Sequence, residues 1–241
     1  MSEELMAIAK MIDHSLLHPT MTDRDLEEGC RLARKHKVAS VCIKPYAVKM
    51  AAKLLKDSGV AVGAVVGFPH GGSTTAVKVA EAEAACRDGA AELDMVVNIG
   101  KVLSGDWKYV EREVKALVKA AHRRKAILKV IFENDFLTED SQKIKLCRIC
   151  SRAGADFVKT STGYGFVKGG DGKYSYQGAT DHDLKLMRAN CPPKVRVKAA
   201  GGVRTLEDVR RVRALGVTRV GATATAQILG AVEKDGRDVG Y

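Results

Sequence analysis

Aromatic residues are scarce in this sequence: Phe, Trp and Tyr make up 5% of its 241 residues. Proteins that bind single-stranded nucleic acid stack bases on aromatic side chains, so this composition supplies few such platforms. No apolar run approaches the roughly 18 residues that a membrane-spanning helix needs. Residues 1–15 carry acids early and lack a long apolar stretch, so we expect neither a signal peptide nor a transit sequence.

Cysteine is also sparse. The six cysteines are scattered along the chain, which does not suit a disulfide-stapled secreted domain, and we expect a reducing cytoplasm as the location. Cys147 and Cys150 have the C-x2-C spacing of zinc and redox sites, but they fall in a helical pattern and no second pair accompanies them. Two thiols facing the core are the favoured interpretation.

Basic residues exceed acidic ones by 40 to 29, which gives a net charge of +11 at pH 7 and raises the question of an acidic partner. Only short basic runs stand out, RKHK at 34–37 and HRRK at 122–125. Each lies at the end of a helical pattern, where cations interact favourably with the helix dipole. Solvated helix ends therefore explain these runs better than a nucleic-acid patch, and we expect neither nucleic acid nor a membrane as a partner.

Short β-branched runs alternate with longer helical patterns. The strand-like runs occupy residues 12–17, 38–43, 60–68, 91–98, 126–133, 156–161, 195–200 and 218–223. The helical patterns lie near 22–36, 45–58, 74–88, 107–124, 138–153, 180–190, 205–215 and 223–230. Eight such units predict an α/β fold in which a parallel sheet closes into a single (β/α)8 TIM barrel, here with a short N-terminal helix. No composition shift marks a second domain, so we expect one domain over residues 1–241.

Capping residues and one unusual loop refine this pattern. Side chains that cap helix N-termini stand before four of the helical patterns, at Thr22, Thr138, Asp181 and Thr205. The loop at 163–178, GYGFVKGGDGKYSYQG, is long and rich in glycine, tyrosine and lysine. Loops of this length in a compact barrel are usually lids or ligand-contacting elements, although the outer half is equally well explained as a surface insertion.

A lysine stands in the middle of the buried strand pattern FVKTSTGY, at Lys159. A buried ammonium loses hydration worth several kcal/mol, so it either pairs with a carboxylate or gives up its proton and acts as a nucleophile. Because strand residues alternate faces, Lys159 and Lys198 point to the barrel axis while Val158 and Val197 face the helices. By the same alternation Asp94 points inward.

Active sites of such barrels are built at the C-terminal ends of the strands. The polar residues embedded near those ends are Asp13, Cys42, Asp94, Lys129, Glu133, Lys159 and Lys198. An ion-pair network that merely fills the barrel is one interpretation. The other is catalytic: a neighbouring ammonium raises the cost of protonating a nucleophilic lysine, so a free amine becomes available to attack a carbonyl and form an imine.

Glycine-rich turns follow the sixth, seventh and eighth predicted strands: STG (161–163), AAGG (199–202) and VGATAT (220–225). Their backbone N–H groups suit an anion, and barrel enzymes commonly hold substrate phosphate near the last two strands. Beside two lysines, they indicate a phosphorylated aldehyde or ketone as substrate.

Metal ions are the competing route to carbonyl activation. His14 and His18 are four residues apart, but in a strand that spacing spans roughly 13 Å, too far to share one ion. His70 ends a strand without a second ligand that must accompany it. We therefore expect no metal and no other cofactor.

In chain order, the segments IDHSLL, VCIKP, VGFPHG, AELDMVVNIG, KVIFE, FVKTSTG and VKAAGGVRT resemble the class I deoxyribose-phosphate aldolases over essentially the whole length. FVKTSTG and KAAGGVRT together are the most specific. The resemblance implies a metal-free lyase of deoxynucleoside catabolism. Such an enzyme reversibly cleaves 2-deoxy-D-ribose 5-phosphate into acetaldehyde and D-glyceraldehyde 3-phosphate, and relatives are often dimers or higher homo-oligomers.

The resemblance also implies residue roles. Lys159 would form the Schiff base, Lys198 would tune it, and Asp94 would work with Lys198 and a water in proton transfer. The implied substrate contacts are Asp13, Cys42, Thr160, Gly163, Gly201, Gly202, Gly221 and Thr223. Whether Cys42 is a reactive thiol or an inert filler stays open.

Three features depart from the usual family pattern. The loop after Thr162 is longer than in many members, and it brings the residues Tyr164, Lys168 and Lys173. Thr223 and Ala224 stand where many members carry paired serines, and Tyr241 is a candidate proton relay at the chain end. Two alternatives stay open: a Schiff-base aldolase for another phosphorylated aldehyde, and a non-catalytic barrel that binds polyanions.

Overall fold

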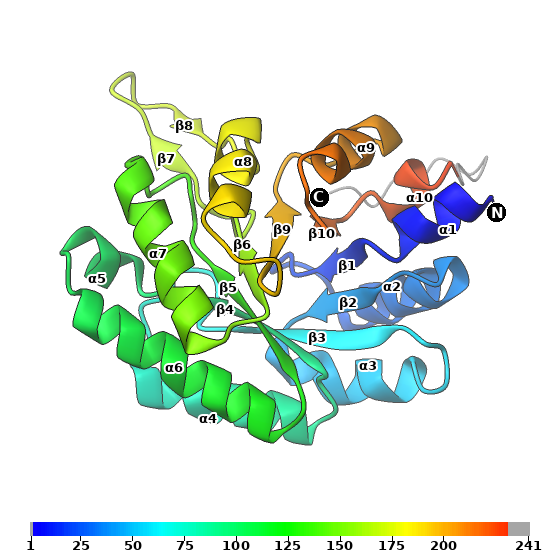
Figure 1. The fold of residues 1–241 in the computed structure, drawn as a ribbon. Coiled ribbons are helices and arrows are strands. Elements are labelled where there is room, and N and C mark those ends of the chain that lie inside the picture. The colour runs from blue at the N-terminus through cyan, green and yellow to red at the C-terminus, as the bar shows by residue number, and fades with distance from the viewer. Residues whose placement is uncertain (1, 231–241) are drawn as a thin grey trace.

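The computed structural model describes residues 2–230, in which eight parallel strands close into a barrel surrounded by helices (Figure 1). Around the barrel the strand order is β1-β2-β3-β4-β5-β6-β9-β10, and β10 pairs with β1 to close it. The strands are β1 (Ile12–Leu16), β2 (Ser40–Ile43), β3 (Ala61–Val66), β4 (Glu92–Val96), β5 (Ile127–Ile131), β6 (Phe157–Lys159), β9 (Arg196–Ala200) and β10 (Arg219–Ala222). The predicted TIM barrel is confirmed.

Each barrel strand is followed by at least one helix, and the predicted short N-terminal helix is α1 (Glu3–Ala9). The others are α2 (Asp23–His36), α3 (Val48–Leu54), α4 (Thr75–Arg87), α5 (Ile99–Leu103), α6 (Trp107–Arg123), α7 (Asp140–Ala153), α8 (Asp181–Ala189), α9 (Leu206–Ala214) and α10 (Thr225–Ile228). A short 3-10 turn, η1 (Pro45–Ala47), precedes α3. None of these helices is long and apolar enough to cross a membrane.

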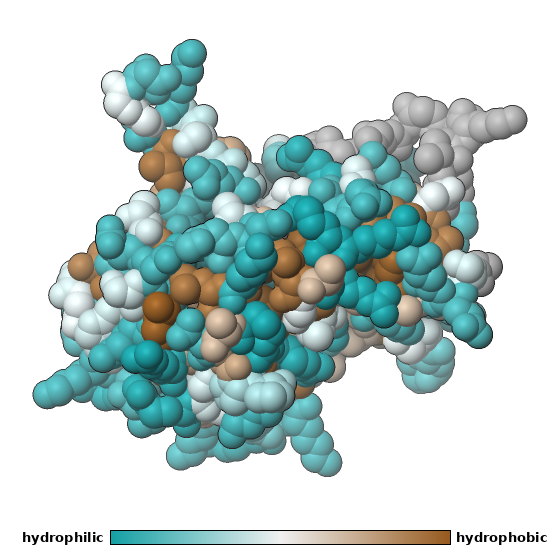
Figure 2. Space-filling view, turned by 45° about the horizontal axis from the view of Figure 1, so that its top comes forward, coloured by the Kyte–Doolittle hydropathy of each residue, from teal (hydrophilic) through white to brown (hydrophobic). Residues whose placement is uncertain are grey.

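Two elements were not predicted from the sequence. The short helix α5 lies between β4 and α6, and an antiparallel hairpin interrupts the loop at 163–178. The hairpin consists of β7 (Val167–Lys168) and β8 (Tyr174–Ser175). It projects from one end of the barrel, and it stands clear of the largely polar face seen in Figure 2. The outer half of the loop is therefore a surface insertion, as one of the two interpretations expected.

Helix N-termini agree with the capping prediction at two of its four positions. Thr22 and Thr205 cap α2 and α9, and each forms a capping box with the aspartate three residues later. The other two predicted caps, Thr138 and Asp181, are each wrong by one residue. The observed cap positions are Glu139 and Thr180, and the Thr180 hydroxyl accepts a hydrogen bond from the backbone of Asp183.

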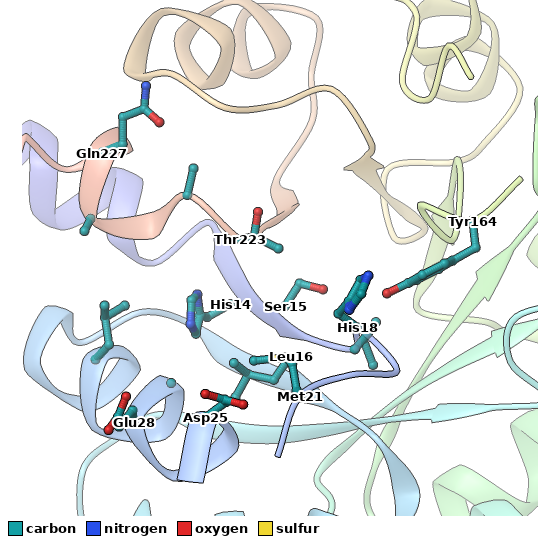
Figure 3. Close-up of a pocket in the computed structure, with 15 residues that line it drawn as sticks. His14, Ser15, Leu16, His18, Met21, Asp25, Glu28, Tyr164, Thr223 and Gln227 are labelled. Carbon is teal, nitrogen blue, oxygen red and sulfur yellow. The ribbon is translucent and has the colours of Figure 1, made fainter. Parts of the chain in front are cut away.

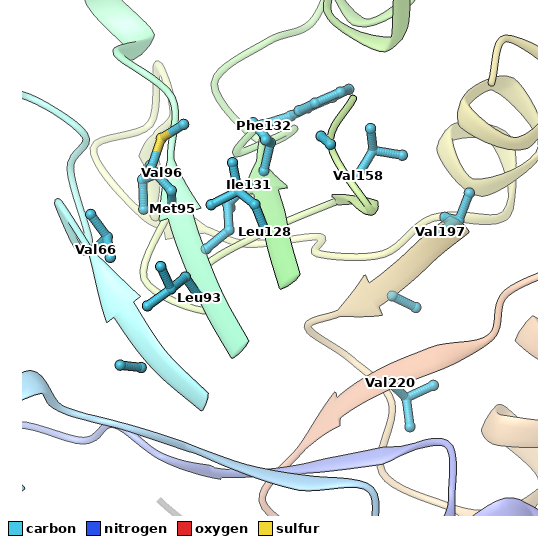
Figure 4. Packing of buried hydrophobic residues seen from close by; sticks show 14 of the residues in the cluster. Val66, Leu93, Met95, Val96, Leu128, Ile131, Phe132, Val158, Val197 and Val220 are labelled. Carbon is cyan, nitrogen blue, oxygen red and sulfur yellow. The ribbon is translucent and has the colours of Figure 1, made fainter. Parts of the chain in front are cut away.

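The apolar core lies between the strands and the helices. Outward-facing strand residues fill it, among them Leu93, Met95, Val158 and Val197, all fully buried (Figure 4). Cys147 and Cys150 also belong to this core, in agreement with the interpretation of that pair as buried thiols. Since side chains alternate along a strand, the residues between these apolar positions are directed into the barrel.

Candidate active site

Charged side chains from six strands form one network inside the barrel. Its members are Asp13, Glu92, Asp94, Lys129, Lys159, Lys198 and Arg219. Strand register places them: Asp94 pairs with Lys129 across β4 and β5, and Lys159 with Lys198 across β6 and β9. The two lysines and the aspartate that the sequence analysis placed on the inner face therefore lie together.

Lys159 and Lys198 meet on one carboxylate oxygen. The Nζ atom of each lies 2.8 Å from Oδ2 of Asp94, and each donates a hydrogen bond to it. Lys198 also donates to Oδ2 of Asp13 at 2.5 Å. Lys198 and Asp94 are fully buried, whereas Lys159 keeps 3% of its surface exposed. Of the two lysines, Lys159 thus has fewer carboxylate partners and more contact with the outside.

Both aspartates are held as anions. Burial alone would raise the pKa of Asp94, but the ammonium groups of Lys129, Lys159 and Lys198 outweigh burial and hold that pKa well below its usual value. Asp13 follows the same logic: Lys129, Lys198 and Arg219 together lower its pKa despite complete burial. The carboxylates remain ionised throughout the neutral range.

Lys129 and Lys198 are held as cations. Burial works against their charged forms, but nearby carboxylates outweigh it and raise the pKa of Lys198, and raise that of Lys129 still further. Lys129 lies within 2.6–2.9 Å of oxygens of Asp13, Glu92 and Asp94.

The network joins four basic groups to three carboxylates, so one positive charge is in excess when all are ionised. An uncompensated buried charge is costly, and a neutral amine at one lysine removes that cost. Lys159 has a single carboxylate partner in the network, whereas Lys129 and Lys198 each have at least two.

A cavity of about 550 Å³ opens onto Lys159 and Lys198. It lies at the C-terminal ends of the strands, where barrel enzymes carry their active sites. The glycine-rich turns expected to bind phosphate line it, through Gly163, Gly201, Gly202, Gly221 and Thr223. Two lysines and the glycine-rich turns thus line one cavity.

Known proteins with this sequence pattern carry the same architecture. The sequence profile described as DeoC/LacD family aldolase matches residues 7–229. The chain belongs to this family. A deoxyribose-phosphate aldolase of Rhodopirellula baltica is 51% identical over 94% of this chain and 90% of that protein, and one of Clostridium perfringens is 48% identical over 92% and 93%. The solved deoxyribose phosphate aldolase of Aeropyrum pernix superposes with a TM-score of 0.83 at 30% identity, covering 94% of this chain and 91% of that one.

Two expected substrate contacts of this DeoC/LacD aldolase do not line the cavity. Asp13 is fully buried beneath it, where it accepts hydrogen bonds from Ser40, Lys129 and Lys198. The Thr160 hydroxyl both donates to and accepts from the backbone of Ala200, at 3.0 Å each. Asp13 and Thr160 therefore hold neighbouring parts of the site in place and do not contact the cavity, because their polar atoms already form hydrogen bonds within the protein.

Cys42 does line the cavity, beside the two lysines. Burial, reinforced by the negative charge of Asp94, raises the pKa of its thiol to about 11. A thiol with this pKa is almost wholly protonated at neutral pH, which favours the inert interpretation over a reactive thiolate.

The loop at 163–178 contacts the cavity through its base. Tyr164, Phe166 and Tyr176 line it, whereas Lys168 and Lys173 are exposed on the hairpin. The loop is therefore a ligand-contacting element near the barrel and a surface hairpin beyond it. The two lysines that it carries do not line the proposed phosphate region.

Glu133, at the end of the strand segment that carries Lys129, anchors the start of this loop. The buried carboxylate accepts hydrogen bonds from the backbone N–H and the hydroxyl of Thr162. A side chain on Gly165 would collide with it, since a Cβ there would lie 2.7 Å from the Glu133 carboxyl carbon. From the sequence, Glu133 was expected only as an embedded polar residue near the end of a strand, and its contact with this loop was not predicted.

A second cavity of about 270 Å³ adjoins the first, between β1, α2 and the turn before α10 (Figure 3). Tyr164 borders both cavities, and its ring points toward His18. His14 lies 2.9 Å from the Thr225 hydroxyl, and burial lowers the pKa of His14 to about 4. The two histidines weighed as metal ligands thus have protein partners, since His18 in turn contacts Thr20 at 2.7 Å.

Glu92 and Arg219 were missed by the sequence analysis. Arg219 forms a two-pronged ion pair with Glu92 and also contacts Asp13. Glu92 lies two residues before Asp94, and Arg219 is in register with Lys198. The alternation that located the inner lysines would have located both, had it been followed to the N-terminal ends of the strands.

Proposed function

We propose that this chain is a class I deoxyribose-phosphate aldolase, a lyase that reversibly cleaves 2-deoxy-D-ribose 5-phosphate into acetaldehyde and D-glyceraldehyde 3-phosphate. The observation that carries the proposal is the shared contact of Lys159 and Lys198 with one oxygen of Asp94, since both lysines line a cavity with a glycine-rich wall. Curated relatives at 51% and 48% identity bear the name of this activity.

The reaction begins at Lys159. Its neutral amine attacks C1 of the open-chain sugar, and loss of water gives an imine between Nζ and C1. Lys198 favours the free amine because it already occupies Asp94 as a cation, and because Asp13 gives it a second anionic partner. The nucleophile is assigned to Lys159 since only one carboxylate holds its ammonium form.

Carbon–carbon cleavage follows from the charge on the imine. The protonated imine at C1 acts as an electron sink, so loss of the C3 hydroxyl proton lets the C2–C3 bond break. D-glyceraldehyde 3-phosphate leaves, and an enamine stays on Lys159. Protonation at C2 and hydrolysis of the imine release acetaldehyde and restore the amine.

We assign the proton transfers to Asp94 and Lys198 together with a water. Asp94 is ionised and accepts hydrogen bonds from both lysines, which suits it to take part in proton transfer through Lys198 and the water. Tyr241, the other candidate relay, lies outside the described residues. We assign the phosphate group to the turns that carry Gly163, Gly201 and Gly221.

The proposal is tested by comparing cleavage of 2-deoxyribose 5-phosphate with that of ribose 5-phosphate and a hexose phosphate, each with and without EDTA. We expect turnover of the first substrate, little of the others, and no loss with EDTA because lysine takes the place of a metal. Faster cleavage of another sugar phosphate would support the alternative aldolase. Inactivity with all substrates, together with steeply salt-dependent DNA binding, would favour the polyanion-binding barrel.

We further propose a homo-oligomer acting in the cytoplasm in deoxynucleotide catabolism, with residues 1–241 forming one domain. The Aeropyrum pernix relative is described as tetrameric. Light scattering on purified protein would detect the assembly, and a monomer at every concentration would contradict that part of the proposal.

A further inference from the structure

The β7–β8 hairpin returns the chain to the barrel directly on top of a glycine turn. Its last residues are clamped there: Asp135 accepts hydrogen bonds from the backbone of Gln177 at 2.6 Å and of Gly178 at 3.1 Å. Ala179 donates to the Gly201 carbonyl at 3.1 Å. The side chain that precedes this clamp, Tyr176, is therefore held in a defined place over the turn after β9.

The hydroxyl of Tyr176 lies against Gly201. A Cβ on Gly201 would lie 1.8 Å from Tyr176 Oη, so the tyrosine occupies the space that a side chain there would need. The aromatic ring also packs against Phe166, with ring centroids 5.5 Å apart. Both aromatic residues line the cavity that contains Lys159. A rigid phenol from the inserted hairpin thus forms part of the glycine-rich wall.

That hydroxyl is buried and has no hydrogen-bond partner among the described residues. Leaving a buried hydroxyl without a hydrogen-bond partner costs roughly 1–3 kcal/mol. In native proteins such a group calls for an explanation, and a ligand or a water that completes the hydrogen bond is one. Burial, together with Asp135 and Glu133, raises the pKa of Tyr176, so the hydroxyl keeps its proton at neutral pH. It is available as a hydrogen-bond donor, which an anion can accept.

The position of Tyr176 and the charge of its neighbours indicate which part of the substrate its hydroxyl contacts. Gly201 directly follows the last residue of β9, Ala200, and lies three residues beyond Lys198 along the chain, so Tyr176 sits over the C-terminal end of that strand and not beside the strand position of the amine. Arg204 lines the same part of the wall. In an extended sugar phosphate, the phosphate lies at the opposite end of the molecule from the C1 carbonyl that reacts with the amine.

We propose that the Tyr176 hydroxyl donates a hydrogen bond to the phosphate of the substrate, and so makes the hairpin a determinant of specificity for phosphorylated sugars. The inference rests on the proposed function. Tyr176 supplies a hydroxyl to a wall whose last turn contributes Thr223, and the next residue, Ala224, has no donor side chain.

The test compares Tyr176→Phe with Tyr174→Phe. The first variant keeps the ring against Phe166 and Gly201 and removes only the hydroxyl. Tyr174 is a matched control, because it lies in the same hairpin with 66% of its surface exposed. For each protein, kcat/KM is measured with 2-deoxyribose 5-phosphate and with 2-deoxyribose, which lacks the phosphate.

We expect Tyr176→Phe to lower kcat/KM for the phosphorylated sugar about tenfold or more, as for a lost hydrogen bond to a charged group, and to leave the unphosphorylated sugar within about twofold. Tyr174→Phe should change neither. An equal loss with both sugars, or no loss with either, would overturn the inference and leave the hydroxyl with a packing role only.

Calorimetric titration with inorganic phosphate gives a readout that does not depend on turnover. We expect Tyr176→Phe to weaken phosphate binding about tenfold relative to both wild type and Tyr174→Phe. Unchanged phosphate affinity in Tyr176→Phe would overturn the inference. A wild-type protein that cleaves no sugar phosphate would defeat the proposed function, and the phosphate titration would still decide the role of Tyr176.

Discussion

The side-chain nitrogens of Lys159 and Lys198 converge on a single atom, since each lies 2.8 Å from Oδ2 of Asp94. Two ammonium groups that share one carboxylate oxygen repel each other, and Lys198 has the stronger claim to its proton through Asp13. The two lysines therefore have different surroundings, although their side chains are chemically identical. In the proposed mechanism Lys198 stays a cation and Lys159 acts as the amine, and both side chains line the cavity.

Replacing Lys198 with methionine should separate catalysis from folding. Asp13 keeps Lys129 and Arg219, and Asp94 keeps Lys129 and Lys159, so the barrel should remain folded. We expect kcat for 2-deoxyribose 5-phosphate to fall about 100-fold or more, since Lys198 both competes with Lys159 for Asp94 and serves proton transfer. Steady-state kinetics measures the loss, with circular dichroism as the control for folding. A kcat within about threefold of wild type would contradict the assigned role.

Stability should fall at both extremes of pH. Burial is outweighed by the surrounding cations, so the pKa values of Asp13, Glu92 and Asp94 lie below their ordinary 3.8, 4.5 and 3.8. Their contribution is fully present above those ordinary values and is lost as the pH falls toward the folded pKa. Lys129 and Lys198 have raised pKa values, so their contribution is full below 10.5 and is lost as the pH rises above it.

Urea unfolding at a series of pH values measures this dependence. We expect a broad plateau in the free energy of unfolding between about pH 5 and about pH 10, with a decline on each side. Asp94→Asn should be less stable on the plateau and should lose less on acidification. A free energy of unfolding that is unchanged down to about pH 2 would contradict the ionised network.

A second buried ion pair, remote in sequence from the lysines of the site, should matter for stability alone. Lys78 donates to Glu113 and to the carbonyl of Val96, at 2.8 Å each, and both charged side chains are fully buried. Glu113→Gln leaves the ammonium without its counter-ion and should cost about 3–5 kcal/mol. The double variant Lys78→Met/Glu113→Leu should recover much of that loss. Chemical denaturation of the two variants checks this, and a cost below about 1 kcal/mol for Glu113→Gln would count against it.

Cys42 should react slowly with thiol reagents near neutrality. With a pKa of about 11, its thiolate fraction rises about tenfold for each pH unit between about pH 7 and about pH 10. Iodoacetamide labelling followed by peptide mass spectrometry should show the same rise at Cys42, and saturation with 2-deoxyribose 5-phosphate should slow it because the thiol lines the cavity. A labelling rate that levels off near pH 8 would contradict the raised pKa.

Local patterns predicted much of this architecture. The two-residue alternation of strands placed Lys159, Lys198 and Asp94 inside the barrel, because the pleat that sets it involves only neighbouring residues. Capping residues located two of the four predicted helix starts and missed the other two by one residue, as at Thr180 and Asp181, where adjacent residues both suit a cap.

What the sequence did not predict depends on contacts between distant strands. Lys129 reaches Asp13 on β1 from the other side of the barrel, a meeting set by the stagger and tilt of the closed sheet and by no local pattern. That stagger also explains why Asp13 lies beneath the cavity, although the resemblance had placed it in contact with substrate. The hairpin was missed because two strands of two residues each leave no periodicity to detect.

The assignment of Lys159 as the covalent nucleophile is tested most directly by trapping. The protein is incubated with 2-deoxyribose 5-phosphate and sodium borohydride, which reduces an imine to a stable amine, and the modified peptide is identified by mass spectrometry with Lys159→Leu as the control. The account predicts an irreversible adduct on Lys159 and none in the variant. An adduct on Lys198 instead, or full cleavage activity without any adduct, would contradict it.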